Sequence, residues 1–400
     1  MRVATRLFLS VAILSACFAT KRCPRAEKFN VILQWTHLNY TWRSPEEYEM
    51  AVSTGRYVPL NNAPTGIKIY KNTLFISVPR FRPGVPATLA SVEAKSLNPL
   101  LVPFPSWEMS DESKCTNLQS VQSMEIDSKG TMWVLDGARI NGYSKCPAKL
   151  LLFDLTDGAG LLRTYTFSNE ISLQDGGFLN DLVIDETDGE FAYATDNSQI
   201  DPGLIVYSRS RNKAWKLRDA SMYPQEGASR FEVNGKILDS FLPLDGIALS
   251  PKSERGSRRV YYCAMGALNL YSIPTKVLKD SKLIESGNWR RHIVKVGQKL
   301  AQSDGLVIDN EGSMFYTLLP YNGVARWSTN SSLWSSEIID QNKETMVWPD
   351  GFAFDESGYI YLITNYIYNF IDPLAEVEKD GRILFRVHRY RTGTKSYLFT

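Results

Sequence analysis

Six short segments of the chain begin with a polar residue, aspartate in half of them, placed directly before a hydrophobic run. We call these the start residues: Thr65, Gln122, Asn180, Asp245, Asp304 and Asp350. A second hydrophobic run follows each first run and ends in an exit residue, among them Arg80, Phe81 and Asn365. Carboxylates held close together raise one another's pKa unless a cation compensates. A cluster of these aspartates would therefore favour a cation, which could be a metal ion, Arg80 or a ligand amine.

The two runs of each segment are joined by a short turn, which predicts a β-hairpin. The turn residues are Lys71-Asn72, Lys129-Gly130, Asp188-Gly189, Arg255-Gly256, Glu311-Gly312 and Ser357-Gly358. In a hairpin the start of the first strand lies beside the end of the second strand, opposite the turn. Each start residue is therefore expected beside the exit residue of its own hairpin.

The start residues recur every 46 to 65 residues, and one hairpin cannot bury its own hydrophobic face. Each period leaves room for two more strands, which predicts an all-β fold: a six-bladed β-propeller with four-stranded antiparallel blades around a central channel. The apolar segments 29–42 and 382–390 are expected to pair and close the ring. The segment Pro45–Ser53 is expected to be a short helix with proline at its start. Ring closure would place all start and exit residues around one mouth of the channel.

An aspartate at a strand start also has a plain structural use, because its carboxylate binds backbone N–H groups in turns. Four other aspartates, just before the hairpin turns, are expected to be turn formers: Asp127, Asp185, Asp309 and Asp355. Trp348 and the other repeat tryptophans are expected in the core between blades.

The sequence shows no specific catalytic constellation. The histidines His37, His292 and His388 lie outside the repeated hairpins, which disfavours a zinc cluster or a Ser-His-Asp triad. Convergent Asp and Asn oxygens suit calcium, but the start set contains no glutamate. We expect no metal and no cofactor.

The charge of the chain is nearly balanced, with 45 basic and 43 acidic residues among 400. No Lys/Arg block or nucleic-acid motif is present, so nucleic acid is not an expected partner. The first apolar run, Leu7 to Ala19, is too short to cross a bilayer as a helix. No membrane association is expected, and the sequence does not determine the oligomeric state.

The N-terminus has the pattern of a secretory signal peptide over residues 1–20, with Met1–Arg6 as the basic part. We therefore expect a secreted, extracellular protein in which residues 21–400 form one propeller. Two N-x-S/T sequons, at Asn39 and Asn330, fit this expectation as glycosylation sites.

Four cysteines remain after Cys17 leaves with the signal peptide, and four cysteines allow three pairings. Cys115 and Cys146 flank the second hairpin in polar, turn-like sequence, so we pair them. Closing this loop would contribute roughly 3–4 kcal/mol in the chain-entropy model. Cys263 lies in an apolar strand, which favours a buried free thiol; Cys23 is free or paired with it.

Several motifs resemble one known family over about residues 30–385. They are VPRFRPGVPATL at Val78–Leu89, PFPSW at Pro103–Trp107, WVLD at Trp133–Asp136, DGIALSP at Asp245–Pro251, SDG at Ser303–Gly305, and Pro349-Asp350 together with Asn365. The chain resembles the insect yellow and major royal jelly protein family, and the Val78–Leu89 segment is the most specific match.

The resemblance implies a secreted six-bladed propeller. Members act in cuticle pigmentation and melanin chemistry, in eggshell hardening, as nutritive jelly proteins or as salivary binders of biogenic amines, and some convert dopachrome. In amine-binding members the ligand lies at one end of the channel. The positions here that match that site are Asp350, Asn365 and Ile367.

From these patterns we predict a ligand site at the channel mouth for a small aromatic amine or catechol-type compound, in cuticle or eggshell pigmentation or hardening. Asp350 and Asp304 would be charge partners, Asn365 a hydrogen-bond partner, and Phe81 and Ile367 the walls. Arg80, Asp245 and Asn180 complete the predicted site.

Two other functions stay open at this point. One is dopachrome tautomerisation, in which a mouth carboxylate of raised pKa would act as general base. The other is a structural eggshell or cuticle component without a small ligand. The sequence identifies no catalytic residue and does not decide whether the protein is an enzyme.

Overall fold

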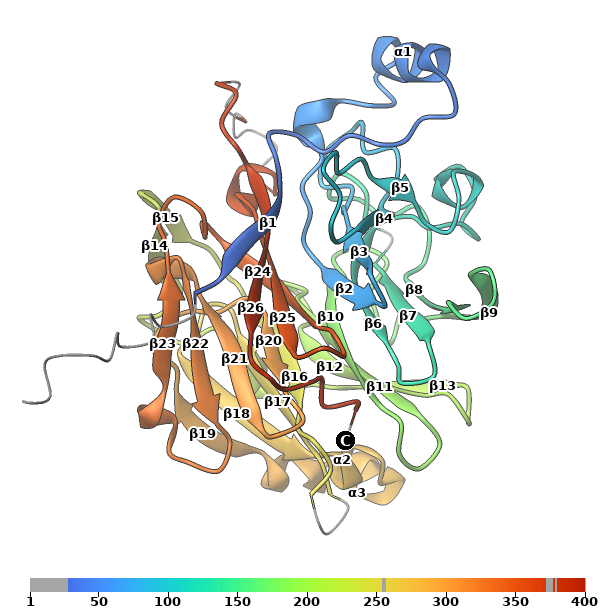
Figure 1. Ribbon diagram of the computed structural model, residues 1–400. Coiled ribbons are helices and arrows are strands. Elements are labelled where there is room, and N and C mark those ends of the chain that lie inside the picture. Colours follow the sequence, from blue (N-terminus) through green and yellow to red (C-terminus); the bar gives the residue numbers. More distant parts are fainter. Residues whose placement is uncertain (1–27, 138, 254–256, 372–376, 378–379, 400) are drawn as a thin grey trace, which may run out of the picture.

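The computed structural model describes residues 28–137, 139–253, 257–371, 377 and 380–399 (Figure 1). The predicted signal peptide, Cys17, Cys23 and the turn Arg255-Gly256 lie outside these residues. The described chain forms six four-stranded antiparallel sheets arranged as blades, so the predicted six-bladed propeller is confirmed.

Each blade is one sheet, written here from the channel outward. Blade 1 is β2 (Ile67–Tyr70), β3 (Thr73–Ser77), β4 (Leu89–Glu93) and β5 (Val102–Pro103); blade 2 is β6 (Val121–Ile126), β7 (Thr131–Asp136), β8 (Lys149–Asp154) and β9 (Gly160–Thr166). Blade 3 is β10 (Leu179–Asp185), β11 (Phe191–Asp196), β12 (Gly203–Ser208) and β13 (Lys213–Leu217); blade 4 is β16 (Leu244–Leu249), β17 (Arg259–Ala264), β18 (Asn269–Pro274) and β19 (Val294–Gln298). Blade 5 is β20 (Leu306–Ile308), β21 (Ser313–Leu318), β22 (Gly323–Ser328) and β23 (Glu337–Gln341); blade 6 is β24 (Pro349–Phe354), β25 (Tyr359–Thr364), β26 (Phe385–Arg391) and β1 (Asn30–Trp35).

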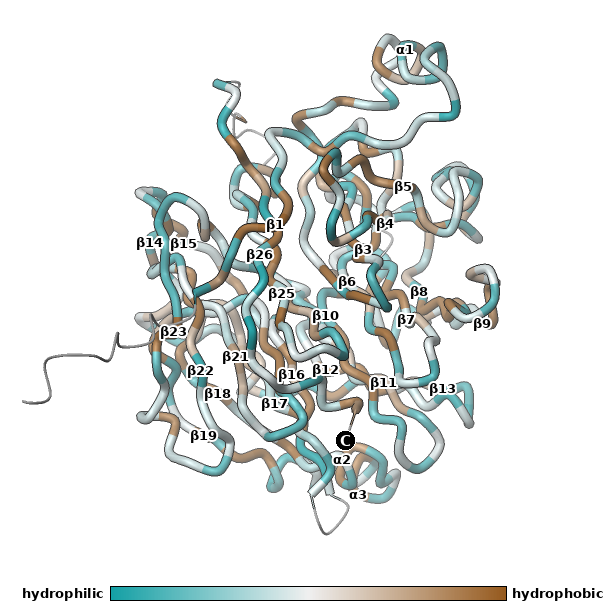
Figure 2. Tube along the Cα trace, viewed as in Figure 1, coloured by the Kyte–Doolittle hydropathy of each residue, from teal (hydrophilic) through white to brown (hydrophobic). Residues whose placement is uncertain are grey.

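The innermost strands follow one another around the channel. β2 contacts β6 and β24, β10 contacts β6 and β16, and β20 contacts β16 and β24. Inner and middle strands such as β7 are buried along their whole length, which explains their nearly continuous apolar sequence. The outermost strand β9 is largely exposed. In Figure 2 the strand interiors are mostly brown or white, whereas most turns are teal.

Blade 6 closes the ring by joining the two ends of the chain. β1 pairs antiparallel with β26, with Leu33 opposite Val387 and Trp35 opposite Phe385. The predicted partnership of segments 29–42 and 382–390 is confirmed. The ring therefore closes by hydrogen bonds between strands about 350 residues apart in sequence.

The elements outside the blades are short. α1 spans Pro45–Ser53, as predicted, and Ser44 caps it by accepting a hydrogen bond from the Glu47 N–H group. α2 (Thr275–Leu278) and α3 (Ser281–Glu285) follow β18. The hairpin of β14 (Arg230–Val233) and β15 (Lys236–Asp239) is inserted between blades 3 and 4 and was not predicted.

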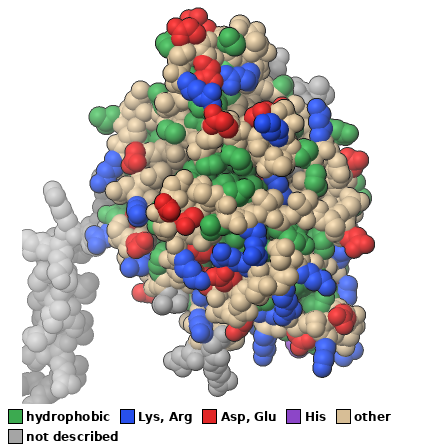
Figure 3. All heavy atoms as spheres, turned by 90° about the vertical axis from the view of Figure 1, so that its right-hand side faces the viewer, with side chains coloured by type: hydrophobic (Ala, Val, Ile, Leu, Met, Phe, Trp, Pro, Cys, Tyr) green, Lys and Arg blue, Asp and Glu red, His purple; other side chains and the backbone are tan. Residues whose placement is uncertain are grey.

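Two surface properties bear on function. No helix among the described residues is long and apolar enough to cross a membrane. Figure 3 shows basic and acidic side chains interspersed over the face that carries β5, β9 and β13, in keeping with the balanced charge. Asn330 is exposed in the connection after β22, whereas Asn39 is partly buried, its side-chain oxygen accepting hydrogen bonds from Tyr40 N and Trp42 Nε1.

The cysteines also follow the sequence analysis where the structure describes them. Cys115 and Cys146 form a disulfide with a Cα–Cα distance of 5.4 Å, so the predicted pairing is confirmed. Cys263 is a buried free thiol in β17. The disulfide fits an oxidising compartment.

Candidate functional site

The starts of the inner strands converge on the axis and line a narrow cavity of about 40 Å³. Polar residues lining it come from five blades: Thr65, Lys68, Gln122, Ser123, Asn180, Asp181, Asp304 and Asp350. Asp245 joins them from blade 4, because its carboxylate accepts a hydrogen bond from the Asn180 amide. The predicted geometry of the start residues is therefore confirmed, while their role toward a ligand stays a prediction.

β-Bulges place these side chains at the axis. In blades 2, 3, 4 and 6 the pairing of the first two strands shifts register at the start residue: Gln122, Asn180, Asp245 and Asp350. A bulge leaves a residue out of the ladder and turns its side chain in a new direction. The hairpin alternation alone would not direct all of these side chains into the channel.

A glycine after the start residue lets neighbouring blades approach closely. A Cβ added to Gly246 would collide with the Asp304 carbonyl oxygen, and one added to Gly305 would collide with the Asp350 carbonyl oxygen. At Gly351 and Gly66 the added Cβ would lie 3.0 Å from the Thr65 carbonyl and 2.9 Å from the Gln122 carbonyl. The repeated Asp-Gly pair thus combines a carboxylate with the close packing that a narrow channel needs.

Hydrogen bonds connect the three start aspartates to their surroundings. Asn197 Nδ2 donates to Asp245 Oδ2 at 2.7 Å, in addition to the bond from Asn180. Trp348 Nε1 donates to Asp304 Oδ2 at 2.7 Å. Asn365 Nδ2 donates to Asp350 Oδ2 at 2.8 Å and to the Pro64 carbonyl at 2.7 Å, while its Oδ1 accepts from Ile367 N. Each carboxylate is thus held by at least one amide or indole donor.

The three carboxyl groups share one electrostatic environment, which raises their pKa values. Burial and the charge of Asp304 raise the pKa of Asp245 well above its usual range. Burial and the charges of Asp304 and Asp245 do the same to the pKa of Asp350. Burial raises the pKa of Asp304 to about 7, although the Trp348 indole opposes this rise by stabilising the charged form.

No basic side chain of the described residues pairs with these carboxylates, because Lys68, which lines the same cavity, pairs with Glu125 instead. No Lys or Arg nitrogen of the described residues lies within ion-pair distance of Asp245, Asp304 or Asp350. The neighbouring Asp181 differs, because a basic side chain acts on it. Burial raises the pKa of Asp181, and the charge of Lys68 offsets part of this rise. Among the described residues no group of three His, Cys, Asp or Glu is placed to hold a metal ion.

Trp348 occupies an unusual backbone conformation beside this cluster. Its φ is +43°, a region that bulky residues rarely adopt, and the residue is 2% exposed. The expected core role is confirmed, but the indole also donates to Asp304. Sequence reasoning missed this contact, and the place of Trp348 directly before Pro349-Asp350 was the available signal.

Arg80 is a predicted site residue that the structure does not bring to the aspartates. Its guanidinium is buried and donates to backbone carbonyls, including those of Val85 and Ser110, at 3.0 and 2.7 Å. It also pairs with Glu112 at 3.1 Å. The positive charge of Arg80 is therefore used in packing these loops, and Arg80 does not line the central cavity.

Phe81 and Ile367, the predicted apolar walls, pack in contacts of their own. The Phe81 ring stacks on Phe178, with centroids 6.4 Å apart, and so joins the exit of blade 1 to the approach of blade 3. Ile367 is buried in an apolar cluster with Trp348 and Tyr366. Phe81 is half-buried and Ile367 is buried, and neither of them lines the central cavity.

The inserted hairpin covers the exits of blades 4 to 6. Phe231 and Val233 of β14 belong to the same apolar cluster as the exit residues Met265 and Leu319. Lys236 of β15 donates to the Tyr368 carbonyl at 3.2 Å. The β14–β15 hairpin, which is not part of the repeat, therefore covers these exits at the mouth.

Other aspartates of the repeats are structural. Asp136 and Asp196 pair with Lys149 and Lys216 at 2.9 and 2.7 Å. The expected turn formers are confirmed; Asp309, for example, accepts from Glu311 N and Ser313 N. The other three bind turn N–H groups in the same way: Asp127, Asp185 and Asp355.

A family model described as major royal jelly protein matches residues 119–384. The chain belongs to the major royal jelly protein family. The resemblance derived from the motifs is thus confirmed. The matched range of the family contains Asp245, Asp304, Asp350 and Asn365, whereas Arg80 and Phe81 precede it.

Two relatives show how far the similarity extends. Over 379 residues the chain is 24% identical to the Dopaminechrome tautomerase of Drosophila melanogaster. This alignment covers 90% of this chain and 81% of that protein. Over 377 residues it is 26% identical to Protein yellow of Drosophila madeirensis, covering 90% of this chain and 64% of that protein. The chain thus spans less than two thirds of this yellow protein. Among solved structures, a luciferin-regenerating enzyme aligns over 86% of this chain and 95% of its own, at 13% identity and a TM-score of 0.49, too distant to bear on function.

Proposed function

We propose that this major royal jelly family protein binds a small aromatic amine or catechol-type compound, with the cationic group of the ligand at Asp245, Asp304 and Asp350. One observation carries the proposal: three neighbouring blades direct carboxylates into one channel, and no basic side chain of the described residues pairs with them. A ligand ammonium would supply the missing positive charge and relieve the mutual repulsion of the carboxylates.

The size of the cavity decides how such a ligand would lie. About 40 Å³ admits an ammonium group or a little water, but no aromatic ring. The ring would lie outward, toward Ile367, Tyr366 and Phe81, which belong to or pack against the same apolar cluster as Phe231 and Val233 of β14. Binding would therefore require β14 to move away from the exits of blades 4 to 6.

Calorimetry with dopamine, serotonin and octopamine tests this proposal. We expect heat of binding with the wild-type protein, and at least a tenfold loss of affinity for Asp304→Asn and Asp350→Ala. Asp157→Asn is the matched control, because Asp157 is exposed on a turn of blade 2. The proposal would be wrong if no heat of binding is measured at micromolar protein concentration, or if all variants bind with equal affinity.

A second candidate is tautomerisation of an aminochrome. It is supported by the similarity to a protein named Dopaminechrome tautomerase and by the Asp304 carboxyl, whose pKa of about 7 suits a general base at neutral pH. In such a reaction a carboxylate takes a proton from an acidic C–H group and a proton returns to another atom. Substrate and product are isomers, so no oxidant or cofactor is needed.

The decay of dopaminechrome absorbance tests the second candidate. General base catalysis is worth about 10²–10⁴ in rate, so Asp304→Asn should lose most of the activity while Asp157→Asn keeps it. A wild-type rate equal to that of buffer rules this reaction out. If neither binding nor turnover is found, the remaining reading is a structural protein without a small ligand.

We place this function outside the cell, in pigmentation or hardening of cuticle or eggshell. The Cys115–Cys146 disulfide and the similarity to Protein yellow support this setting. Secretion of the tagged full chain into culture medium, with loss of residues 1–20 seen by mass spectrometry, is the expected result.

A further inference from the structure

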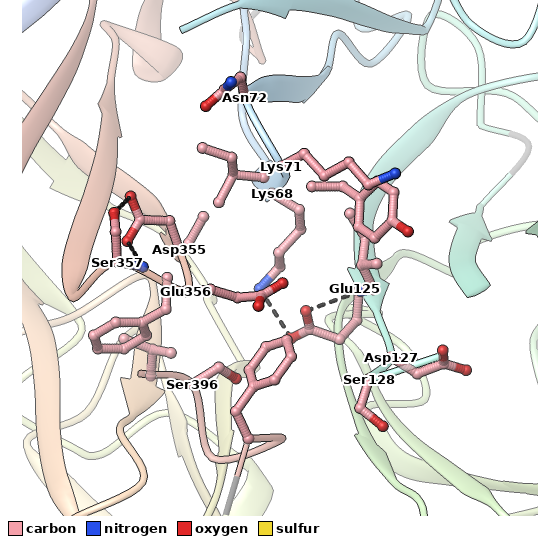
Figure 4. A pocket seen from close by; sticks show the side chains of 17 residues that line it. Lys68, Lys71, Asn72, Glu125, Asp127, Ser128, Asp355, Glu356, Ser357 and Ser396 are labelled. Atoms are coloured by element: carbon pink, nitrogen blue, oxygen red, sulfur yellow. Dashed lines mark hydrogen bonds and ion pairs between the residues drawn. The ribbon is translucent and has the colours of Figure 1, made fainter. Parts of the chain in front are cut away.

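A second and larger cavity lies at the opposite end of the channel, where the hairpin turns meet. Its volume is about 330 Å³, within the usual range of small-molecule pockets. Its lining comes from the inner strands and turns of blades 1, 2, 5 and 6 and from the C-terminal segment Ser396–Phe399 (Figure 4). We call it the turn-end pocket.

The chain's own C-terminal segment forms one wall of this pocket. Tyr397 is 1% exposed, and its hydroxyl accepts a hydrogen bond from Ile184 N in blade 3 at 2.9 Å. Asn310 binds Lys395 through two hydrogen bonds and so fixes the segment to blade 5. The segment thus fills the part of the opening beside blades 3 and 4, and the remaining part is the pocket.

A buried ion pair forms the floor of the pocket. Lys68 Nζ lies 3.0 Å from Glu125 Oε2, and the two side chains are 15% and 9% exposed. Glu125 Oε1 also accepts from Ile126 N at 3.0 Å. An ammonium group has three donors, and Glu125 is the one hydrogen-bond partner of Lys68 Nζ among the described residues. Donors of Lys68 therefore remain for a ligand.

The walls combine apolar surface with one unbound carboxylate. Tyr70, Val307, Phe354 and Phe399 supply the apolar part. The acidic turn residues Asp127 and Asp355 are occupied by turn N–H groups. Glu356 is exposed and has no ion pair with a described residue. In Figure 4 its side chain extends from the turn of blade 6 into the pocket, on the side of Lys68.

We propose that the turn-end pocket binds a small zwitterion, an amino acid with an aromatic side chain. The carboxylate of the ligand would accept from Lys68, its ammonium would donate to Glu356 and Glu125, and its ring would lie on Phe354 and Val307. A singly charged ligand would meet an opposite charge only at Lys68 or only at Glu356. A zwitterion would meet one at each, while the ion pair between Lys68 and Glu125 stays intact.

This site is independent of the function proposed for the mouth. The two cavities lie at opposite ends of the hairpins, although Lys68 lines both. Variants at the two ends therefore distinguish them: Asp304→Asn should leave zwitterion binding unchanged, and Glu356→Gln should leave amine binding at the mouth unchanged.

Calorimetry with L-phenylalanine tests the proposal, with phenethylamine and 3-phenylpropionate as probes that each lack one charge. We expect L-phenylalanine to bind at least tenfold more tightly than either. Glu356→Gln and Lys68→Met should each weaken binding at least tenfold, while Glu344→Gln, at another exposed glutamate, should not. Ser396→Trp should abolish binding by filling the pocket from the C-terminal segment, and it keeps the proposal testable if Lys68→Met fails to fold.

Three results would overturn the proposal. One is no heat with L-phenylalanine, L-tyrosine or L-tryptophan. Another is phenethylamine binding as tightly as L-phenylalanine, which would indicate a simple cation site. The third is loss of zwitterion binding in Asp304→Asn but not in Ser396→Trp, which would place the ligand at the mouth.

Discussion

Asp304 and Asp309 show how the same side chain takes two roles only five residues apart. Asp309 lies before the hairpin turn and binds two turn N–H groups. Asp304 lies at the strand start, where its carboxylate faces the channel and accepts a hydrogen bond from the Trp348 indole. Position relative to the turn, which the repeat reveals, separates the two roles. The contact with Trp348 depends on an unusual φ and could not be predicted from the sequence.

The raised pKa of Asp304 makes stability depend on pH. With a folded-state pKa of about 7 against about 3.9 in the unfolded chain, the folded protein holds more protons between these values. Its stability therefore falls as the pH rises through this window. Asp304→Asn cannot ionise, and its amide oxygen can still accept from Trp348. We expect the variant to gain stability relative to wild type between about pH 4 and pH 8, measured by urea unfolding.

Asp157→Asn provides the control for the same chemical change at an exposed position. This substitution at an exposed site should change the unfolding free energy by about 0.5 kcal/mol or less. A constant difference between Asp304→Asn and wild type over the whole range would contradict a raised pKa of Asp304 in the folded protein.

At the scale of elements, the Asp-Gly pair at the start of an inner strand has two separable functions. In blades 4 and 6 the aspartate lies in a bulge and faces the channel. The glycine has no Cβ and so leaves space for the backbone of the next blade. Blades 2 and 3 carry Ser123 and Asp181 in the glycine position, where the Ser123 hydroxyl donates to Asp181 at 2.7 Å. The repeat predicted where these residues meet, but the bulges that orient them depend on strand pairing and were not visible in the sequence.

Gly305→Ala tests the packing function of the pair. The φ of Gly305 lies outside the left-handed region, so the substitution acts through space alone, and the new Cβ would collide with the Asp350 carbonyl. Overpacking of this kind costs about 1–3 kcal/mol or more. Gly160→Ala is the matched control, because its nearest contact would be 4.0 Å away. Denaturant unfolding should show a large loss for Gly305→Ala and almost none for Gly160→Ala; equal losses would contradict the close approach of the blades.

At the scale of the whole molecule, the sequence predicted the parts that repeat and missed those that occur once. Six hairpins, the closing strands and α1 each follow from a local pattern or a period. The β14–β15 hairpin and the C-terminal segment were missed because their positions depend on contacts with distant blades. Arg80 was expected at the mouth from its place after β3, but backbone carbonyls of nearby loops bind its guanidinium instead.

Closure of the ring by β1 should determine both global stability and the mouth site, because β1 completes the blade that carries Asp350 and Asn365. Leu33 in β1 is 3% exposed, and Val31 in the same strand is 39% exposed. Leu33→Asp would bury an unpaired charge, which costs several kcal/mol, whereas Val31→Asp should cost about 1 kcal/mol or less. We expect Leu33→Asp to lower the melting temperature strongly and to expose the amides of β24 and β25 to hydrogen exchange. Similar effects of both substitutions, or exchange confined to β1, would show that the other five blades hold the ring and the site without this strand.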